Sequence, residues 1–302
     1  MVIGDEGRRL RRFVIRYAIS NWIYGDEPLR EQFARLARFG YEGIELVGEP
    51  DRYAVKDLKN LCKEFGIMIS SVLGWSIHGI PGRDGASPKE EERKSALQYC
   101  QNCVNLASEL EAPILVVIPA PAGRTAPTGA PNSQDDWFAG YRLEWNLAVD
   151  SLGRLSSFAT QQGVVLGLEP INRYETFLVN NIDQALRMIK EVGSDQLKLH
   201  LDTFHMNIDE SDLPGAIRRA AGILVNMHIS DSNREAPGRG HIDFHSLVGA
   251  LKEICYTGYL TLEPVPPGSD PLLMTQLPKN YDLRDIYAQE SITYLQKVEA
   301  SI

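Results

Sequence analysis

Four acidic or imidazole residues stand at the ends of short apolar runs in the second half of the chain. The runs read VVLGLE, LKLHLD, ILVNMHIS and GYLTLE, and the residues are Glu169, Asp202, His228 and Glu263. Each run is followed by a polar, irregular segment. Three carboxylates that converge on one place repel one another unless protons or a cation neutralise them. The pattern therefore predicts a metal site with all four residues as ligands.

The ligand set indicates which metal and which chemistry to expect. Carboxylates and one imidazole suit Mn²⁺ best, with Co²⁺ or Mg²⁺ as alternatives, whereas structural zinc prefers thiolates. A hydroxyketone can chelate such an ion through adjacent oxygens, which polarises its carbonyl and acidifies the neighbouring C–H bond. A metal beside a carboxylate base is thus a site for proton abstraction.

The elements that carry these residues form a regular alternation. Eight apolar, strand-like runs are each followed by a helix-like segment, and several of those segments end on a glycine that suits a left-handed C-cap. Eight such repeats predict a closed parallel (β/α)8 TIM barrel, and we expect residues 1–302 to form one domain of this type. The strand-like runs are FVIRYAIS, YEGIEL, IMISSVLG, APILVVIP, VVLGLE, LKLHLD, ILVNMHIS and GYLTLE.

The barrel geometry divides the work among the four residues. Glu169 and Glu263 end the fifth and eighth strands, which lie three apart in an eight-stranded ring, so they should approach a substrate from opposite sides. One carboxylate could then remove a proton and the other return one to the opposite face, as an epimerisation requires. We therefore expect both glutamates to be catalytic. An aldose-ketose isomerase could manage with a single base.

Further candidates lie in the segments that follow the ligand strands. Glu175, His205 and Arg234 could bind substrate hydroxyl groups, and His205 and Arg234 could stabilise a developing oxyanion. The alternative for each is a surface or salt-bridge role. His200 shares a strand face with Asp202 and is expected to be a packed, hydrogen-bonded barrel residue. Four aromatic residues of the first half could form the wall around the far end of a sugar or could simply be packing: Tyr17, Trp22, Trp75 and Trp137.

Three connections are longer than the others, at about residues 74–88, 120–136 and 264–281. All three follow strands, so in a barrel they lie on the same side as the ligands. Long loops on this side are candidate lids that exclude water and select the substrate. The glycines Gly238, Gly240 and Gly268 could instead hold a phosphate, because barrels often bind phosphate after the last two strands.

Composition excludes several other classes of protein. The 302 residues carry a formal net charge of −9, which disfavours nucleic-acid binding because that depends on basic residues. No window approaches the roughly 20 apolar residues of a membrane span, and the N-terminal segment has no apolar stretch of signal-peptide length. Cys100 and Cys103 lie on one helix face and are expected to be buried, inert thiols. We expect a cytoplasmic enzyme whose substrate is a small neutral or metal-held molecule.

The motifs resemble one known superfamily. LEPINRYE, LDTFHMN and HISDSNREAPGRG resemble the sugar phosphate isomerase/epimerase superfamily with the xylose isomerase-like barrel. The likeness is greatest to ketose 3-epimerases of D-tagatose, D-psicose (allulose) or L-ribulose. This resemblance implies that Glu169 and Glu263 are both ligands and the acid/base pair, and that Glu175, His205 and Arg234 bind the first substrate oxygens. It also implies a homodimer or homotetramer.

Relatives within this superfamily leave other reactions open. Hydroxypyruvate isomerases and sugar-phosphate epimerases look similar, and inosose dehydratases share the metal set but eliminate water. A DNA-repair endonuclease of the same barrel is disfavoured by the acidic charge and by the lack of further His and Asp ligands. A catalytically silent binding barrel is disfavoured by the complete set of ligands and bases. The sequence therefore favours a metal-dependent ketose 3-epimerase that deprotonates and reprotonates C3 through an enediolate.

Overall fold

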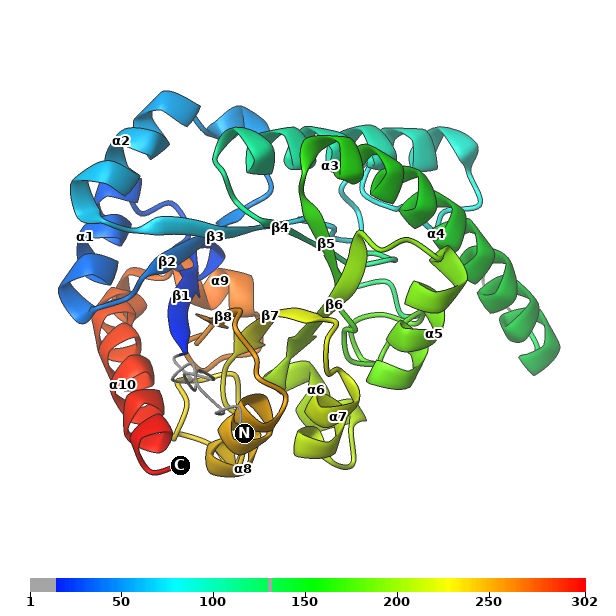
Figure 1. Ribbon diagram of the computed structural model, residues 1–302. Coiled ribbons are helices and arrows are strands. Elements are labelled where there is room, and N and C mark those ends of the chain that lie inside the picture. Colours follow the sequence, from blue (N-terminus) through cyan, green and yellow to red (C-terminus); the bar gives the residue numbers. More distant parts are fainter. Residues whose placement is uncertain (1–14, 130–131) are drawn as a thin grey trace, which may run out of the picture.

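The protein folds as a closed barrel of parallel strands surrounded by helices. The computed structural model describes residues 15–129 and 132–302, and within them the strands pair in chain order from β1 to β8, with β8 closing on β1. This confirms the (β/α)8 barrel predicted from the sequence (Figure 1). The strands are β1 Arg16–Ser20, β2 Gly43–Val47, β3 Met68–Leu73, β4 Ile114–Val117, β5 Val165–Leu168, β6 Leu197–Asp202, β7 Leu224–Ile229 and β8 Tyr259–Leu262.

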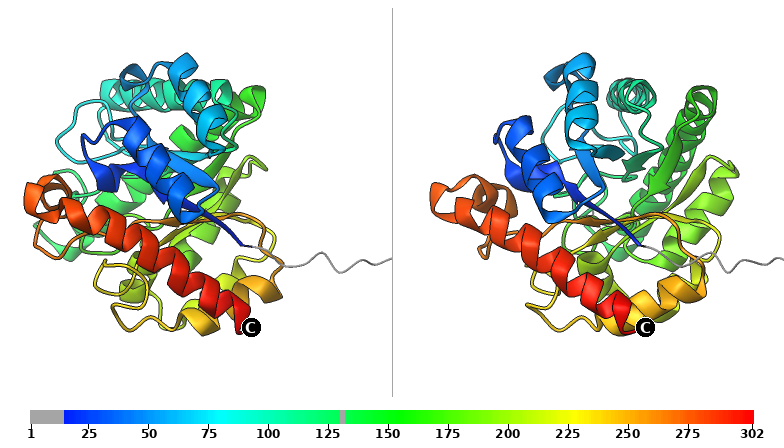
Figure 2. Two further views of the ribbon diagram at one scale, coloured as in Figure 1. Left: turned by 90° about the vertical axis from the view of Figure 1, so that its left-hand side faces the viewer. Right: turned by 60° about the vertical axis from the view of Figure 1, so that its left-hand side comes forward.

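Helices cover the outside of the barrel. The α-helices are α1 Leu29–Phe39, α2 Val55–Phe65, α3 Glu90–Glu109, α4 Gln134–Gln162, α5 Ile182–Val192, α6 Thr203–Asp209, α7 Leu213–Arg219, α8 Phe244–Glu253, α9 Pro271–Gln276 and α10 Tyr281–Ala300. Short 3-10 helices span Asn21–Tyr24, Pro50–Arg52 and Pro278–Asn280. The last helix, α10, lies against α1 and α8 and completes the outer ring (Figure 2).

The helix ends follow the chemistry expected of them. Gly40, Gly66, Gly163 and Gly193 end α1, α2, α4 and α5 in the left-handed conformation. The Asn181 side chain accepts a hydrogen bond from the amide of Gln184 and so caps α5. These local signals set the helix boundaries.

Two helices differ from the sequence prediction. Helix α4 begins at Gln134, inside the connection predicted at residues 120–136, because the Ser133 hydroxyl accepts from the amide of Asp136 and caps the helix. As a result α4 extends beyond the barrel (Figure 1), and the connection expected to run to residue 136 ends inside this helix. The segment TFHMN was expected as a loop but forms α6, because the Asp202 carboxylate caps it through the amides of Phe204 and His205.

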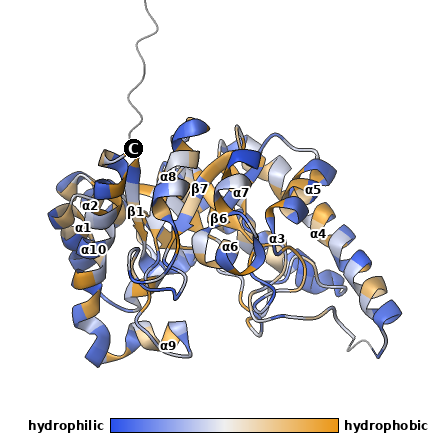
Figure 3. Ribbon diagram, turned by 90° about the horizontal axis from the view of Figure 1, so that it is seen from below, coloured by the Kyte–Doolittle hydropathy of each residue, from blue (hydrophilic) through white to orange (hydrophobic). Residues whose placement is uncertain are grey.

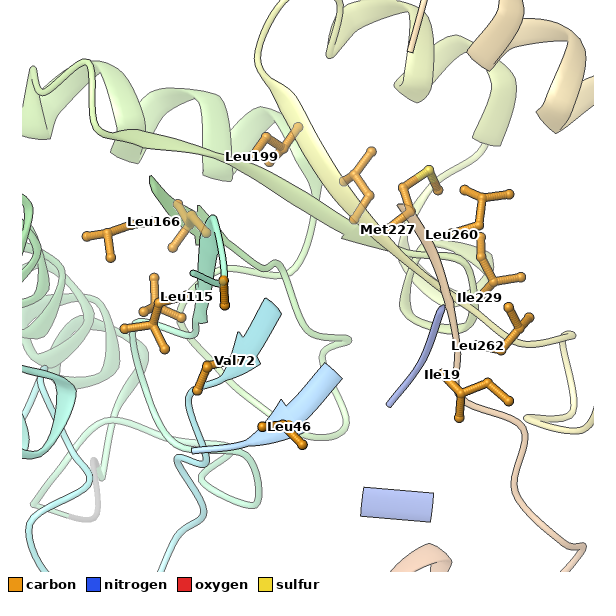
Figure 4. Packing of buried hydrophobic residues seen from close by; sticks show 14 of the residues in the cluster. Ile19, Leu46, Val72, Leu115, Leu166, Leu199, Met227, Ile229, Leu260 and Leu262 are labelled. Carbon is orange, nitrogen blue, oxygen red and sulfur yellow. The ribbon is translucent and has the colours of Figure 1, made fainter. Parts of the chain in front are cut away.

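Apolar side chains alternate with polar ones along the strands. One set, which includes Leu166, Leu199 and Leu260, forms a continuous apolar cluster with residues of the surrounding helices (Figure 4). The alternate residues face the barrel interior, where many are polar and buried: Ser20, Glu45, Ser71, His200, Asn226 and Thr261. The strand–helix layer therefore supplies the hydrophobic core, and much of the barrel interior is left for polar groups.

The connections after β3 and β4 are joined to each other. We call residues 74–88 and 120–129 the loop wall. Isolated parallel bridges pair Ile77 with Ala122 and Arg124 with Thr176. Arg124 also forms buried ion pairs with Asp84 and with Glu144 of α4. The connection after β8 is built differently, since it carries α9, which lies at the end of the molecule opposite the chain's C-terminus (Figure 3).

Candidate active site

The four residues predicted as ligands lie together at the carboxyl ends of β5 to β8. All four are buried. The Nδ1 atom of His228 lies 3.2 Å from Oε1 of Glu169 and 3.5 Å from Oε2 of Glu263. Asp202 is joined to Glu263 by Arg234, whose guanidinium nitrogens lie 2.9 and 3.0 Å from one oxygen of each carboxylate. The strand ends thus converge on one small volume.

The chemistry of these donors fits a divalent cation. Three sets of side chains each offer ligand atoms within 4.8 Å of one another, and they share members: Glu169, His200 and His228; Glu45, His228 and Glu263; Glu169, Asp202 and His205. The donors are carboxylate oxygens and imidazole nitrogens, which suit hard or borderline ions. Several buried acids around one imidazole also leave excess negative charge, which a divalent cation would neutralise.

Electrostatics within the cluster shift several pKa values. Burial disfavours the charged imidazole, but Glu263, Glu45 and Glu169 outweigh it and hold the pKa of His228 well above its usual range. Burial raises the pKa of Glu263 to about 7, although His228 and Arg234 oppose the change. For Asp202, Arg234 and two histidines overcome burial and lower the pKa. In the absence of metal, a protonated His228 therefore balances part of the negative charge.

Glu45 is a member of this cluster that the sequence analysis missed. It lies on β2, is fully buried, and its Oε1 atom is 2.9 Å from Nε2 of His228. It sits inside the apolar run YEGIEL between Ile44 and Leu46, whereas the predicted ligands stand at or near the ends of their runs. The available signal was an acidic residue on the inward face of a strand whose other side chains are apolar.

His200 is packed as expected but lacks the expected hydrogen bonds. Its ring meets that of His228 edge-on, with centroids 4.1 Å apart. Neither ring nitrogen has a hydrogen-bond partner within the described residues, because the nearest acid, Glu169, lies 3.6 Å away and is turned towards His228. Burial and neighbouring histidines hold the pKa of His200 well below its usual range, so this ring is neutral.

The three predicted substrate-binding residues line one cavity with the ligands. Glu175, His205 and Arg234 all border it. Asn172, which sequence reasoning did not single out, lies between two of them. Its side-chain amide is 2.9 Å from Glu175 Oε1 and 2.8 Å from His205 Nδ1, and its backbone N–H is 3.4 Å from the same nitrogen. Because Nδ1 accepts these N–H groups, the proton of neutral His205 is on Nε2.

The cavity has a volume of about 650 Å³ and extends from the ligands to the start of α9. Its wall is largely apolar and includes Trp22, Trp75 and Leu272. The rings of Trp22 and Trp75 lie 6.2 Å apart, and the indole N–H of Trp22 donates to Glu263. The other two aromatic candidates are packing residues. Tyr17 donates to Glu299 of α10, and Trp137 stacks on Tyr141 outside this cavity.

Two of the glycines considered for phosphate binding, Gly238 and Gly240, do not form an open anion site. The N–H groups of Gly238, Ser232 and Ile242 donate to the carboxylate of Asp231. The same carboxylate lies 2.2 Å from where a Cβ of Gly240 would stand. A phosphate at this turn would therefore meet a negative charge and amides that are already occupied. Gly268 borders the cavity near α9.

Cys100 and Cys103 both lie on α3. Cys103 is buried as predicted, whereas Cys100 is half-buried. Burial raises the pKa of Cys100 to about 12 and that of Cys103 further still, which agrees with inert thiols. Within residues 15–129 and 132–302, no helix combines the length and apolar character needed to cross a bilayer.

Comparison with known proteins identifies the family. Residues 33–284 match the xylose isomerase-like TIM barrel family, so the chain belongs to that family. This confirms the resemblance found in the sequence and accounts for the parallel barrel with acidic and imidazole residues at its strand ends.

Individual relatives are epimerases of sugars, in agreement with the enzyme class predicted from the sequence. The chain is 29% identical over 263 residues to 3-dehydro-D-guloside 4-epimerase of Escherichia coli, covering 85% of this chain and 95% of the relative. It is 43% identical over 122 residues to L-ribulose 3-epimerase of Mesorhizobium japonicum, which covers 40% of this chain and only 41% of that protein. A solved D-allulose 3-epimerase from Methylomonas sp., in complex with D-allulose, superimposes with a TM-score of 0.79 at 27% identity and covers 94% of this chain and 96% of that one.

Proposed function

We propose that this protein is a divalent-metal-dependent ketose 3-epimerase acting on free keto sugars. The observation that carries the proposal is the placement of Glu169 and Glu263, two buried carboxylates that approach Nδ1 of His228 from β5 and β8. Epimerisation next to a carbonyl needs a proton carrier on each face of the carbon. The named 3-epimerase relatives support the same reaction.

Glu169, Asp202, His228 and Glu263 would hold the metal. When bound, the metal would polarise the substrate carbonyl and make the adjacent C–H more acidic. We favour Mn²⁺ for this oxygen-rich set, with Co²⁺ or Mg²⁺ as alternatives. The identity of the metal, the cytoplasmic location and the homodimer or homotetramer stay predictions.

The protein side chains supply the proton transfers. One of Glu169 and Glu263 removes the proton at C3, and the other delivers a proton to the opposite face of the planar enediolate. Trp22 and Arg234 both donate to Glu263 and hold it in place. In the metal-free site burial raises the pKa of Glu263 to about 7, so this carboxylate takes up a proton near neutral pH until a cation neutralises the site.

The neighbouring residues bind the substrate oxygens. His205 presents Nε2–H as a donor because Asn172 occupies its other nitrogen. Arg234 contributes further N–H groups, and Glu175 offers a carboxylate oxygen to a hydroxyl group. Donors fixed in this way can stabilise an oxyanion as it develops. The occupied amides around Asp231 favour a free sugar over a sugar phosphate.

A substrate panel tests the proposal. Metal-free protein is incubated with Mn²⁺ and with free and phosphorylated ketoses, and the products are followed by NMR in D2O. We expect inversion at C3 with one deuterium incorporated there, loss of activity with EDTA and recovery with Mn²⁺. A product lighter by one water would identify a dehydratase, and activity that is indifferent to EDTA would overturn the metal-dependent mechanism.

A second candidate is the 4-epimerisation of a 3-keto glycoside. Two observations favour it: the E. coli relative of that type is matched over 95% of its length, and the cavity is large. At ~30 Å³ per water, a cavity of this volume holds roughly twenty water-sized groups, against about twelve non-hydrogen atoms in a hexose. The proton chemistry is unchanged, since C4 is next to the C3 carbonyl.

The same panel distinguishes the two candidates if it includes 3-keto glycosides. A ketose 3-epimerase should turn over the free ketose faster and exchange deuterium at C3. A glycoside 4-epimerase should turn over the 3-keto glycoside faster and exchange deuterium at C4. The ratio of kcat/KM values for the two substrate classes decides between them.

A further inference from the structure

Glu45 lies beneath the candidate metal ligands, in the barrel interior. It comes from β2, in the half of the barrel that supplies none of the predicted ligands, and its exposed fraction is 0%. The β2–β3 register shifts between Ile44 and Glu45, which brings Ser71 beside Glu45. Register irregularities of this kind often re-aim side chains near active sites.

Both carboxylate oxygens of Glu45 are engaged. Oε2 accepts from the hydroxyl of Ser71 at 2.7 Å, and Oε1 lies 2.9 Å from Nε2 of His228. The side-chain Nδ2 of Asn226 in turn donates to the Ser71 hydroxyl at 3.4 Å, and the Thr261 hydroxyl donates to Oδ1 of Asn226. The result is a buried polar network that spans β2, β3, β7 and β8.

The network orients the imidazole of His228. An ionised carboxylate can only accept hydrogen bonds, so Nε2 of His228 must carry the proton that it shares with Glu45. The other nitrogen, Nδ1, then faces Glu169 and Glu263 at 3.2 and 3.5 Å. A histidine that binds metal through one nitrogen commonly donates its other N–H to a carboxylate, which fixes the ring and raises its basicity.

We propose that Glu45 is a positioning residue, which holds His228 in the Nε2–H tautomer so that Nδ1 is the metal-binding atom. The competing assignment makes Glu45 itself a ligand, since its oxygen lies within 4.8 Å of ligand atoms of His228 and Glu263. The contacts favour positioning, because Ser71 and His228 already occupy the two oxygens of Glu45. This inference rests on the proposed metal site but not on which sugar the enzyme converts.

Metal titration without any sugar tests the proposal. Metal-free wild type, Glu45→Gln and Glu45→Ala are titrated with Mn²⁺ by EPR and with Co²⁺ by visible absorption. We expect Glu45→Ala to lose about 10- to 100-fold in affinity. Glu45→Gln keeps an oxygen that accepts from Nε2–H, so it should retain more affinity than the alanine variant. The Co²⁺ band positions should be unchanged in Glu45→Gln, because the ligands remain the same.

A matched control separates positioning from general destabilisation. Glu144 of α4 is equally buried but pairs with Arg124, away from the ligands. Glu144→Gln should lower Tm and leave Mn²⁺ affinity within about twofold of wild type. In ¹⁵N NMR of the Mg²⁺-loaded protein, His228 should show a protonated Nε2 in wild type, and this signature should be lost in Glu45→Ala.

The possible results separate the positioning role of Glu45 from the proposed function. Shifted Co²⁺ bands in Glu45→Gln would make Glu45 a ligand and overturn the positioning role. Wild-type affinity in a folded Glu45→Ala would also overturn it, while leaving the proposed epimerase intact. Failure of wild type to bind any of the three ions would remove both this inference and the proposed function. Wild-type metal binding with no turnover of any keto sugar would remove the proposed function alone.

Discussion

The two halves of the barrel contribute different things to the candidate site. Strands β5 to β8 each place one predicted ligand at the carboxyl end, namely Glu169, Asp202, His228 and Glu263. The half formed by β1 to β4 places none of them there, but it supplies Glu45 from below and Trp22, Trp75 and the loop wall around the cavity. Strands β5 to β8 thus supply the residues proposed to bind metal and transfer protons. The other half supplies Glu45, which contacts His228, and the cavity surface that would contact the rest of the substrate.

This contrast predicts that changes in the ligand half should affect the chemical step most. Glu169→Gln and Glu263→Gln should each lower kcat by about 10²- to 10⁴-fold, because each removes one proton carrier. Steady-state kinetics and deuterium exchange at the reacting carbon measure the effect. Glu64→Gln, an exposed glutamate of α2, serves as the control. Turnover near the wild-type level in either variant would refute the two-base mechanism.

The pH dependence of metal binding tests whether His228, in the ligand half, binds the metal. The carboxylates around His228 hold its pKa well above the usual range, so the metal-free imidazole stays protonated at neutral pH. Metal must displace that proton, and below pH 7 also the proton of Glu263, whose pKa is raised to about 7. Affinity should therefore rise about tenfold per pH unit between pH 7 and the pKa of His228, and more steeply below pH 7. Calorimetry in two buffers of different ionisation enthalpy should show about one to two protons released per Mn²⁺ bound at pH 7. Release of no proton would contradict the assignment.

Changes in the other half should affect substrate binding instead. Trp75→Ala removes an aromatic face from the cavity and should raise KM about 3- to 10-fold, from about 0.5–1.5 kcal/mol of lost contact, with metal affinity unchanged. Trp137→Ala, an aromatic residue outside the cavity, provides the comparison. A large fall in kcat for Trp75→Ala would break the division of roles between the halves.

A change in the helical layer should affect stability alone, even within the ligand half. Asn181→Ala removes the cap of α5 and should cost about 1 kcal/mol of unfolding free energy. For a chain of this size we expect Tm to fall by about 1.5–2 °C. Thermal unfolding measures this, and kcat/KM at 25 °C should stay within experimental error of wild type.

Site residues could be predicted from the sequence where an acidic or imidazole side chain stands at the end of an apolar, strand-like run. Asp202 and its three partners follow apolar runs, and parallel strands bring their carboxyl ends to one face, so their convergence could be predicted. Glu45 could not be found in that way because it lies within a run, and its role depends on a register shift between β2 and β3. Asn172 was missed for a similar reason, since its contacts with Glu175 and His205 join segments far apart in the chain.

Helix boundaries depended on single capping interactions that periodicity does not reveal. The hydroxyl of Ser133 begins α4 well before the apolar pattern starts. Asp202 was read as a metal ligand only, yet one of its oxygens caps α6 while the other faces Arg234. A residue with two roles in the fold shows only one of them in the sequence.

The uneven anchoring of the cavity rim bears on how its specificity could be redesigned. The loop wall is held by strand-like bridges and by the buried pairs of Arg124, so substitutions there disturb several segments together. The α9 segment instead offers Pro271 and Leu272 to the cavity from a short helix capped by its own Asp270. A mutant library confined to Pro271 and Leu272, which spares the capping Asp270, would therefore vary the substrate surface while leaving the folded scaffold and the acid/base pair untouched.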